Sequence, residues 1–468
     1  MRNLLAVALV SCASSPSHPA DPITSEEPPI RMIASEPAAP PPVITPIEEA
    51  VAEASANPPY ASDIRSVRFL RGYAVKKEPR AEAAAAGVAK KGTHAAIQRA
   101  LPPGNGCASR WIEIQPRGFV CEDVLEPSSA APTVASTFAL DGDDDVGPLV
   151  PGVYGIVRGT NAQSFASRDD VLAGNGRALA GSNTVRAAGA ISIDGERYWR
   201  TSRGELINAR SIAQISPSKF RGLAIADGAR LPAWIRSHES SRKPVVTRAT
   251  PSRRGKATGE LAPRTVVTIE EESADGRFVR VAEGAWISRA DVRVATLAAA
   301  PPGTTANEKW FDVDLDQQTL VAYEGERPVY ATLVSTGKYL HATPTSVARI
   351  ASKHESAAMT SDTEGSVYSV ADVPWTMYYD GDFALHTSYW HDGFGGPRSH
   401  GCVNLAPRDA RKLFQWSSPD VPPGWSTVYG DADNPGTLVR VRSKKVAEPA
   451  FRGYARALRD RAVVATSN

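Results

Sequence analysis

The sequence has no excess of either charge, few cysteines and almost no long apolar runs. Its 53 lysines and arginines are nearly matched by 51 aspartates and glutamates, which leaves a net charge of +2. Such a balance gives no overall field that would favour nucleic acid. Apart from a short apolar run at the start, no stretch approaches the length of a transmembrane helix. The 468 residues suffice for roughly two to four domains.

Only four cysteines are present. Cys107 and Cys121 lie fourteen positions apart, a spacing that suits a disulfide between adjacent strands. A bridge closing a loop of that size would stabilise the fold by about 3 kcal/mol in an oxidising compartment. The alternative is a pair of free, buried thiols.

Cys12 ends a short N-terminal pattern. Arg2 supplies one positive charge, residues 4–10 are apolar, and Leu9–Cys12 (LVSC) resembles the signal box of bacterial lipoproteins. We therefore expect residues 1–12 to be a signal peptide that ends at a lipidated cysteine. The protein would then lie in the periplasm of the cell envelope, anchored by lipid to the outer membrane, since no aspartate follows Cys12 to suggest inner-membrane retention. The alternative is a cytosolic N-terminus with a chance cysteine.

Residues 13–62 are rich in proline, alanine, serine and glutamate, so they bury too little apolar surface to fold and should form a disordered tether. Between 63 and 298 a weak repeat follows. In three places a second apolar segment begins eight residues after an aromatic residue, with a glycine just before it. The three pairs are Trp111 with Phe119, Tyr198 with Leu206, and Phe278 with Trp286.

This spacing predicts two short strands joined by a glycine-containing turn in each copy. Residues 63–126 and 243–298 resemble bacterial SH3-like β-barrels, whereas 127–242 should contain strands of a fold that we do not assign. This resemblance implies that the modules either bind peptides or glycan of the bacterial cell wall through exposed aromatics, or serve as spacers whose aromatics fill small cores.

After a linker at 299–306, the region 307–443 opens with alternating apolar residues. Phe311, Val313 and Leu315 lie on one face of a predicted strand, and turns separate further strands, as in a β-meander. One helix is predicted at Ala406–Trp416. We therefore expect a mainly β, multidomain protein with few helices. Residues 444–468 form a basic tail, either a solvated helix or a contact for anionic wall polymer.

The hexapeptide Ser399–Asn404 (SHGCVN) places Cys402 behind His400 and Gly401, with His386 sixteen positions upstream. A thiol acts as a nucleophile only as thiolate, so it needs a neighbouring imidazole to take its proton. The predicted helix just after Cys402 would add its N-terminal dipole. A polar orienter such as Asn404 completes the general form of a thiol acyl-transfer site.

Two other interpretations of this cluster account for it less well. A zinc site formed by His386, His391, His400 and Cys402 has suitable ligand atoms, but its spacings match no usual ligand module. An inert, buried Cys402 fits poorly with the glycines and polar residues around it.

The segment Ala384–Thr387 (ALHT), a glycine-rich loop and the SHGCVN hexapeptide resemble the signature of the L,D-transpeptidase catalytic domain, the YkuD type of bacterial wall synthesis. The resemblance covers roughly 307–443. Two positions depart from the family pattern: Thr387, where many relatives have glycine, and Thr345, since a glycine often follows Thr-Pro.

The resemblance implies that Cys402 is the nucleophile and His386 its proton acceptor and donor. Backbone N–H groups around Gly401 and Cys402 would hold the oxyanion, Thr387 would orient His386, and His400 and Asn404 would shape the turn. Candidates for substrate contact are Trp375, Tyr378, Tyr389 and Ser399; the alternative is that the aromatic residues among them belong to the core.

The implied reaction acts on peptidoglycan stem peptides. A cysteine thioester would form with release of D-Ala, and an amine of a second stem peptide would then give a cross-link. With water as acceptor, the enzyme would be an L,D-carboxypeptidase or amidase, and the same chemistry could attach proteins to the wall. An inactive wall-binding protein is disfavoured by the intact Cys402 and His386. No metal, organic cofactor or nucleic acid is implied, and we expect a monomer.

The anchoring hypothesis predicts that Cys12→Ala releases the protein into the soluble periplasmic fraction or blocks its processing. Stable anchoring requires the several acyl chains that a lipidated N-terminal cysteine carries, because one chain binds a membrane only marginally. Detergent partitioning measures the effect. Partitioning that the substitution leaves unchanged, or a mature N-terminus mapped elsewhere, would exclude the lipoprotein assignment.

Overall fold

The computed structural model describes residues 60–134, 147–179, 182–236, 243–281, 285–361 and 368–466. Cys12, the predicted signal peptide and the tether up to residue 59 lie outside them. The described residues are mainly β with few helices, which confirms the predicted fold class. None of these helices is long and apolar enough to cross a membrane. The chain forms two compact units, one of residues 60–84 and 91–133, and one of residues 85–90 with those from 134 onward.

The smaller unit contains the first hairpin module. Its strands are β1 (Ser66–Phe69), β2 (Tyr73–Lys76), β4 (His94–Ala95), β5 (Ile97–Leu101), β6 (Trp111–Ile114), β7 (Phe119–Cys121) and β8 (Leu125–Ser128). Cys107 and Cys121 are joined by a disulfide. The bridge packs against the buried Trp111, whose indole N–H donates to the Gly104 carbonyl. The disulfide and Trp111 therefore close one small core.

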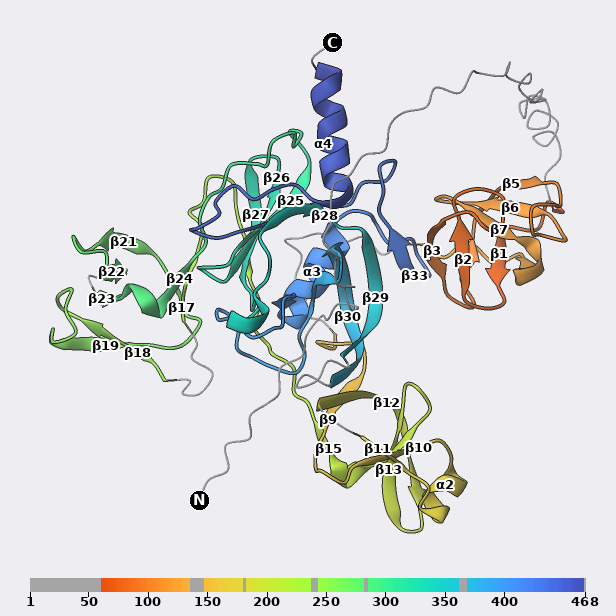
Figure 1. Ribbon diagram of the computed structural model, residues 1–468, viewed down its shortest axis with the longest axis horizontal. Helices are drawn as coiled ribbons and strands as arrows, with labels where there is room; N and C mark the ends of the chain where they lie inside the picture. Colours follow the sequence, from red (N-terminus) through yellow and green to blue (C-terminus); the bar gives the residue numbers. More distant parts are fainter. Residues whose placement is uncertain are drawn as a thin grey trace, which may run out of the picture. The chain divides into compact units, whose positions relative to one another are not determined.

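The larger unit contains two further hairpin modules (Figure 1). The second has β9 (Val153–Val157), β10 (Gln163–Phe165), α2 (Arg168–Ala173), β11 (Arg177–Ala178), β12 (Ser182–Ile193), β13 (Glu196–Thr201), β14 (Leu206–Asn208) and β15 (Ile212–Gln214). The third has β17 (Ala233–Ile235), β18 (Val245–Arg248), β19 (Ala257–Leu261), β20 (Val266–Val267), β21 (Ile269–Glu272), β22 (Phe278–Val281), β23 (Ala285–Ser288) and β24 (Val292–Val294).

The predicted repeat is confirmed as three antiparallel hairpins, β6–β7, β13–β14 and β22–β23. Each hairpin continues into a short 3-10 helix and one more strand; the helices are Glu122–Val124, Ala209–Ser211 and Arg289–Asp291. Gly118 and Gly204 have φ of +96° and +86° in the hairpin turns, where glycine is favoured. The SH3-like assignment itself stays a prediction.

The third module begins earlier in the chain than its predicted start at 243. Strand β17 pairs with β20 and β24, and Ala233 and Ile235 lie in the core with Ile287. A strand of three residues is too short to show a period in the sequence, which explains why the boundary was placed later.

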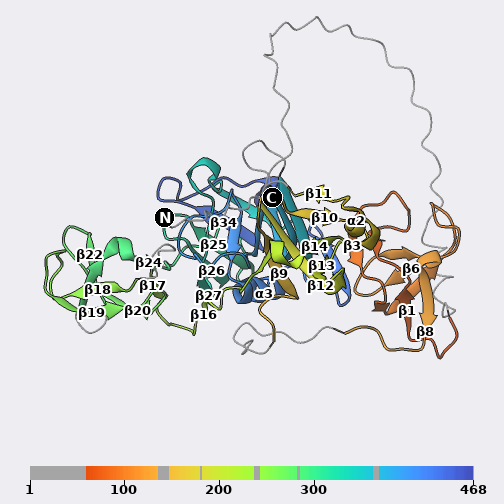
Figure 2. The same cartoon turned by 90° about the horizontal axis from the view of Figure 1, so that it is seen from below.

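The C-terminal region has two sheets that enclose a helix. The first sheet has the order β16-β27-β26-β25-β34-β28, and Figure 2 shows several of its strands side by side. Its strands are β16 (Leu223–Ala224), β25 (Lys309–Asp314), β26 (Thr319–Glu324), β27 (Arg327–Leu333), β28 (Ser346–Arg349) and β34 (Leu438–Arg442).

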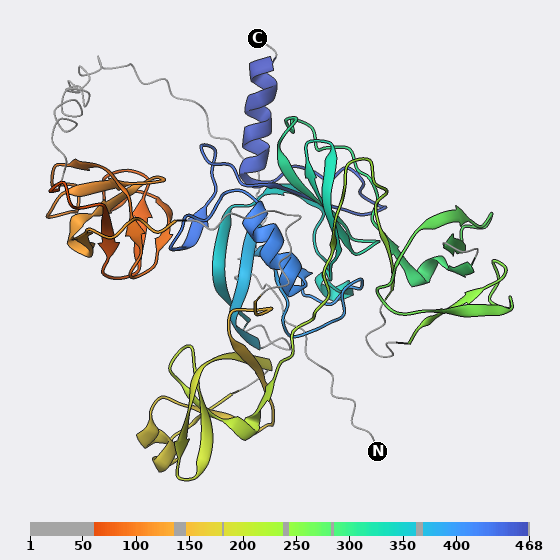
Figure 3. The same ribbon diagram turned by 180° about the vertical axis from the view of Figure 1, so that it is seen from behind.

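The second sheet contains β29 (Ser352–Ser361), β30 (Tyr368–Asp380), β31 (Phe383–Thr387), β32 (Val403–Leu405) and β33 (Trp425–Tyr429), and β33 also pairs with β3 (Ala85–Ala89). Helix α3 (Pro407–Trp416) lies against β30 and β31, as Figure 3 shows from behind. Its Leu413 and Phe414 join Phe311 and Val441 of the first sheet and Leu385 of the second in one core. A 3-10 helix (Tyr339–His341) and the C-terminal helix α4 (Gly453–Thr466) complete the region.

Helix α3 confirms the predicted helix but does not begin next to Cys402. Strand β32 separates the two, and Ala406 is the N-cap. Since the helix dipole acts over about the first turn, the expected stabilisation of a Cys402 thiolate by this helix is not supported.

Strand β16 brings a distant segment into the first sheet. It pairs with β27, and the Gly222 N–H before it donates to the Asp409 carboxylate in the first turn of α3 at 2.8 Å. Asp409 also accepts from the hydroxyls of Tyr330 and Thr332. Burial raises the pKa of Asp409 to about 6. These bonds fix the segment between the second and third modules to the C-terminal region.

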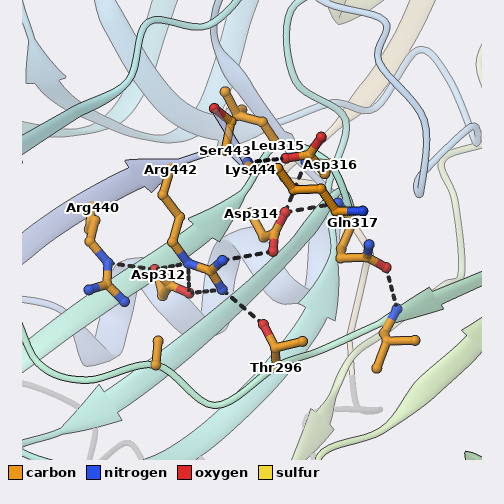
Figure 4. A network of polar contacts seen from close by, with 12 residues as sticks. Thr296, Asp312, Asp314, Leu315, Asp316, Gln317, Arg440, Arg442, Ser443 and Lys444 are labelled. Carbon is orange, nitrogen blue, oxygen red and sulfur yellow. Dashed lines mark hydrogen bonds and ion pairs between the residues drawn. The ribbon is translucent and has the colours of Figure 1, made fainter. Parts of the chain in front are cut away.

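A charged network lies on the other face of the first sheet (Figure 4). The parallel pairing of β25 with β34 sets Asp312 opposite Arg440 and Asp314 opposite Arg442. Arg440 Nε donates to Asp312 at 2.7 Å, and Arg442 binds both carboxylates at 2.9 and 3.0 Å. The Asp312 side chain is 1% exposed, so the free energy lost when its charge leaves water must be offset by these two arginines.

The preceding segment covers this network. Arg440 donates to the Ala299 carbonyl at 2.8 Å, and Arg442 donates to the Thr296 hydroxyl at 2.9 Å. The predicted linker therefore contacts the sheet, and both faces of β25 are buried.

We predict that Asp312→Ala lowers the free energy of unfolding by about 3–5 kcal/mol, because it leaves the largely buried Arg440 without a carboxylate and removes one of the two carboxylates that bind Arg442. Denaturant unfolding measures the loss. Asp227→Ala is the matched control, since Asp227 pairs with Arg327 but is 80% exposed, and it should cost less than about 1 kcal/mol. Equal losses in the two variants would contradict the role of the network.

Candidate active site

Two parallel strands bring the predicted site residues together. Strands β31 and β32 pair with His386 opposite Asn404 and Leu385 opposite Val403. Cys402 directly precedes β32, and the Ala384 N–H lies 3.4 Å from its sulfur. The pairing thus joins residues sixteen positions apart in one buried site.

His386 is held in one tautomer. Its Nδ1 lies 2.9 Å from the carbonyl oxygen of Thr387, which can only accept, so Nδ1 carries the hydrogen and donates it. Nε2 is therefore the basic nitrogen. Burial lowers the pKa of His386 to about 4, so the imidazole is neutral near pH 7. Thr387 acts here through its backbone.

The turn before Cys402 requires glycine at position 401. Gly401 has φ of +133°, and a Cβ there would lie 2.5 Å from the ring of Phe383. The Thr343 hydroxyl donates to the Gly401 carbonyl at 2.7 Å. The Ser399 hydroxyl donates to the Cys402 carbonyl at 2.5 Å and accepts from the Gly401 N–H at 3.1 Å. The Gly401 N–H, expected to hold an oxyanion, is thus already bonded.

His391 supports the site from the loop between the two strands. Its Nδ1 accepts from the Gly393 N–H at 3.2 Å, so in the neutral ring Nε2 carries the hydrogen. Nε2 lies 2.9 Å from Nδ2 of Asn404, while Oδ1 of the same amide has no partner. Two donors cannot bond to each other, so we assign the Asn404 amide the opposite orientation, in which its oxygen accepts from Nε2. Burial lowers the pKa of His391 to about 3, which keeps it neutral. No sequence pattern indicates this bond, because His391 lies in an irregular loop and Asn404 is thirteen positions further on, in β32.

His400 is half-buried beside the turn. Its ring centroid lies 4.2 Å from that of His341, and it stacks on Tyr368 at 6.3 Å. The neighbouring Tyr339 and Leu340 are largely exposed. His400 therefore lies at the border between the buried site and the surface.

The four predicted substrate contacts differ in placement. Tyr389 is buried, with its hydroxyl 2.7 Å from the Ala371 carbonyl and its ring 4.1 Å from that of Tyr154. Ser399 is buried and fully used in the turn. This placement indicates structural roles for both. Trp375 and Tyr378 are half-buried, and their contact with substrate stays a prediction.

Residues 308–441 match the family model of the L,D-transpeptidase catalytic domain, YkuD. This part of the chain is therefore similar to YkuD-type L,D-transpeptidase catalytic domains. A search of curated proteins found no match.

Several solved L,D-transpeptidases are similar to the chain. That of Stackebrandtia nassauensis is 27% identical, with a TM-score of 0.21 over 30% of this chain and 57% of its own. The catalytic domain from E. faecium is 26% identical, with a TM-score of 0.23 over 29% of this chain and 98% of its own. The enzyme of Mycobacterium smegmatis is 19% identical, with a TM-score of 0.23 over 48% of this chain and 100% of its own.

We predict that Gly401→Ala lowers the free energy of unfolding by about 2–4 kcal/mol, because it adds left-handed strain and a clash with Phe383. Gly396→Ala is the control from the same loop: a Cβ there meets no atom within 4 Å, and φ is ordinary. It should change stability by less than about 0.5 kcal/mol. Thermal or denaturant unfolding tests both. A tolerated Gly401→Ala would show that the turn does not need glycine.

Proposed function

We propose that the protein is a peptidoglycan L,D-transpeptidase that uses the reduced Cys402 as nucleophile and His386 as base. The observation that carries this proposal is the Thr387–His386 hydrogen bond, which leaves a neutral Nε2 on the strand beside Cys402. The catalytic-domain match at 308–441 supports the substrate class.

In the proposed reaction, Nε2 of His386 takes the Cys402 proton as sulfur attacks the carbonyl that joins the third stem residue to the terminal D-Ala. The tetrahedral intermediate collapses, the C–N bond breaks, and His386 returns the proton to the leaving D-Ala amine. A thioester remains. The amine of a second stem peptide then attacks it, which forms the cross-link and regenerates the thiol.

The Gly401 N–H can contribute to oxyanion binding only if Ser399 releases it, since the two are bonded in the resting site. One such donor is typically worth about 3 kcal/mol to the transition state. We place the enzyme in the periplasm, held at the outer membrane by lipid on Cys12, with SH3-like modules between anchor and catalytic domain.

Cys402→Ser should abolish acylation while keeping the fold, because a hydroxyl of similar size is a far weaker nucleophile near neutral pH. A homologous E. faecium catalytic domain is described as acylated by ertapenem. We therefore expect intact-mass measurement, under reducing conditions, to show an ertapenem adduct on the wild type and none on Cys402→Ser. An equal adduct on both proteins would overturn the nucleophile assignment.

Cross-linking itself needs a separate measurement. Muropeptide profiles with and without the gene should show loss of dimers that are linked through their third residues. If trimmed stems or protein-linked stems change instead, the acceptor is water or a protein amine, and the transferase assignment is wrong.

His386→Ala should slow acylation by about 10²–10⁴-fold, whereas His400→Ala should slow it only partially. The base accepts a proton only in its neutral form. With a pKa of about 4, the imidazole of His386 is neutral above about pH 4. Acylation should therefore keep its rate from pH 7 down to about 5 and fall below that. An acid limb near the usual histidine pKa of about 6.5, or a larger loss in His400→Ala, would contradict the assignment.

A further inference from the structure

We propose that Arg264 of the third hairpin module is a positioning residue for the active site, which it supports by holding the β31–β32 loop (residues 388–402) in its working conformation. This inference rests on the proposed function. It also gives that module a role in the reaction besides spacing or wall binding.

Two arginines of the third module bind this loop at separate points. Arg264 Nη1 lies 2.8 Å from the Asp392 carboxylate, and its Nη2 donates to the Asp392 carbonyl oxygen. Arg293 Nε donates to the Gly395 carbonyl at 2.8 Å. A guanidinium that binds both the side chain and the backbone of one residue fixes its orientation as well as its position.

Both arginines are removed from water. The Arg264 side chain is 18% exposed, and its guanidinium lies 5.2 Å from the ring centroid of Phe220, which in turn stacks on Phe394 of the loop. Burial lowers the pKa of Arg293 to about 10, so it remains charged near pH 7. Desolvated cations need acceptors, and the loop supplies Asp392 to Arg264 and the Gly395 carbonyl to Arg293.

The backbone of Arg264 is itself unusual. Its φ is +67°, in the left-handed region that glycine normally occupies. Its N–H donates to the Ile235 carbonyl at 2.8 Å, and the Ile235 N–H donates to the Thr265 carbonyl at 2.9 Å. These bonds to β17 hold the strained residue in place. Strained backbone of this kind persists only where the surrounding structure holds it in place, and it is often found at functional sites.

The loop connects this contact to the reacting residues. Asp392 follows His391, which bonds to Asn404, and Asn404 pairs opposite His386 in the β31–β32 register. On the other side, the ring of Trp390 lies 5.9 Å from that of His386. Loss of the contact between Arg264 and Asp392 would therefore loosen both the His386 imidazole and strand β32, without a direct contact from Arg264 to either.

The test compares Arg264→Ala with Arg277→Ala, a matched control whose side chain is 79% exposed and pairs with Asp275 in the same module. We expect Arg264→Ala to lower the maximal rate of ertapenem acylation at least tenfold, and Arg277→Ala to leave it unchanged. Arg264→Lys should recover part of the rate, since it keeps the charge but not the two-pronged geometry.

Asp392→Ala should cause a similar loss, and the double variant with Arg264→Ala should lose no more than either single variant. Wild-type acylation by Arg264→Ala, or losses that multiply in the double variant, would overturn the inference. A lower melting temperature with an unchanged maximal rate would show a merely structural contact and would also overturn it.

A second readout separates this inference from the proposed function. Iodoacetamide alkylation of reduced Cys402 reports activation of the thiol without any wall substrate. If the wild type forms no ertapenem adduct, yet Arg264→Ala slows alkylation tenfold, the proposed function fails and the positioning role stands. Equal alkylation of both proteins would reject the positioning role.

Discussion

The catalytic domain depends on the parallel pairing of β31 with β32. Parallel neighbours need a long crossover, which in most proteins contains a helix with its own hydrogen bonds. Here the crossover is the irregular β31–β32 loop, so its polar groups need partners from elsewhere. The Gly395 N–H donates to the Val334 carbonyl, and Gly393 accepts from the Ser335 hydroxyl. The order of the site therefore depends on the residues outside the loop that hydrogen-bond to its backbone.

Burial sets the resting state of the site. Desolvation lowers the pKa values of His386 and His391, so both rings are neutral and each needs one donor and one acceptor. Backbone groups supply one of the two partners of each ring: the Thr387 carbonyl accepts from His386, and the Gly393 N–H donates to His391. A neutral base is ready to accept a proton, whereas an exposed histidine would be partly charged near its usual pKa.

Local patterns predicted the parts of the structure that depend on neighbours in the sequence. The SHGCVN hexapeptide with His386 indicated the site, alternation in Phe311–Leu315 indicated β25, and the eight-residue spacing from an aromatic residue to the next apolar segment indicated the hairpins. Contacts between distant segments were not predictable, because no period records them. Tyr389 looked suited to substrate contact, but Tyr154, far away in the sequence, covers it. Nothing near Arg264 in the sequence points to Asp392.

The chain does not run through its modules in simple succession. Between the second and third modules it passes along the catalytic domain, where β16 forms the outer strand beside β27. The edge of this sheet is thus supplied by residues that precede the family match by more than eighty positions. A protein shortened to the matched domain would expose the free N–H and C=O groups of β27, and such an edge invites pairing with other chains. The folded unit is therefore larger than the segment that matches the catalytic-domain family, because its sheet includes a two-residue strand outside that segment.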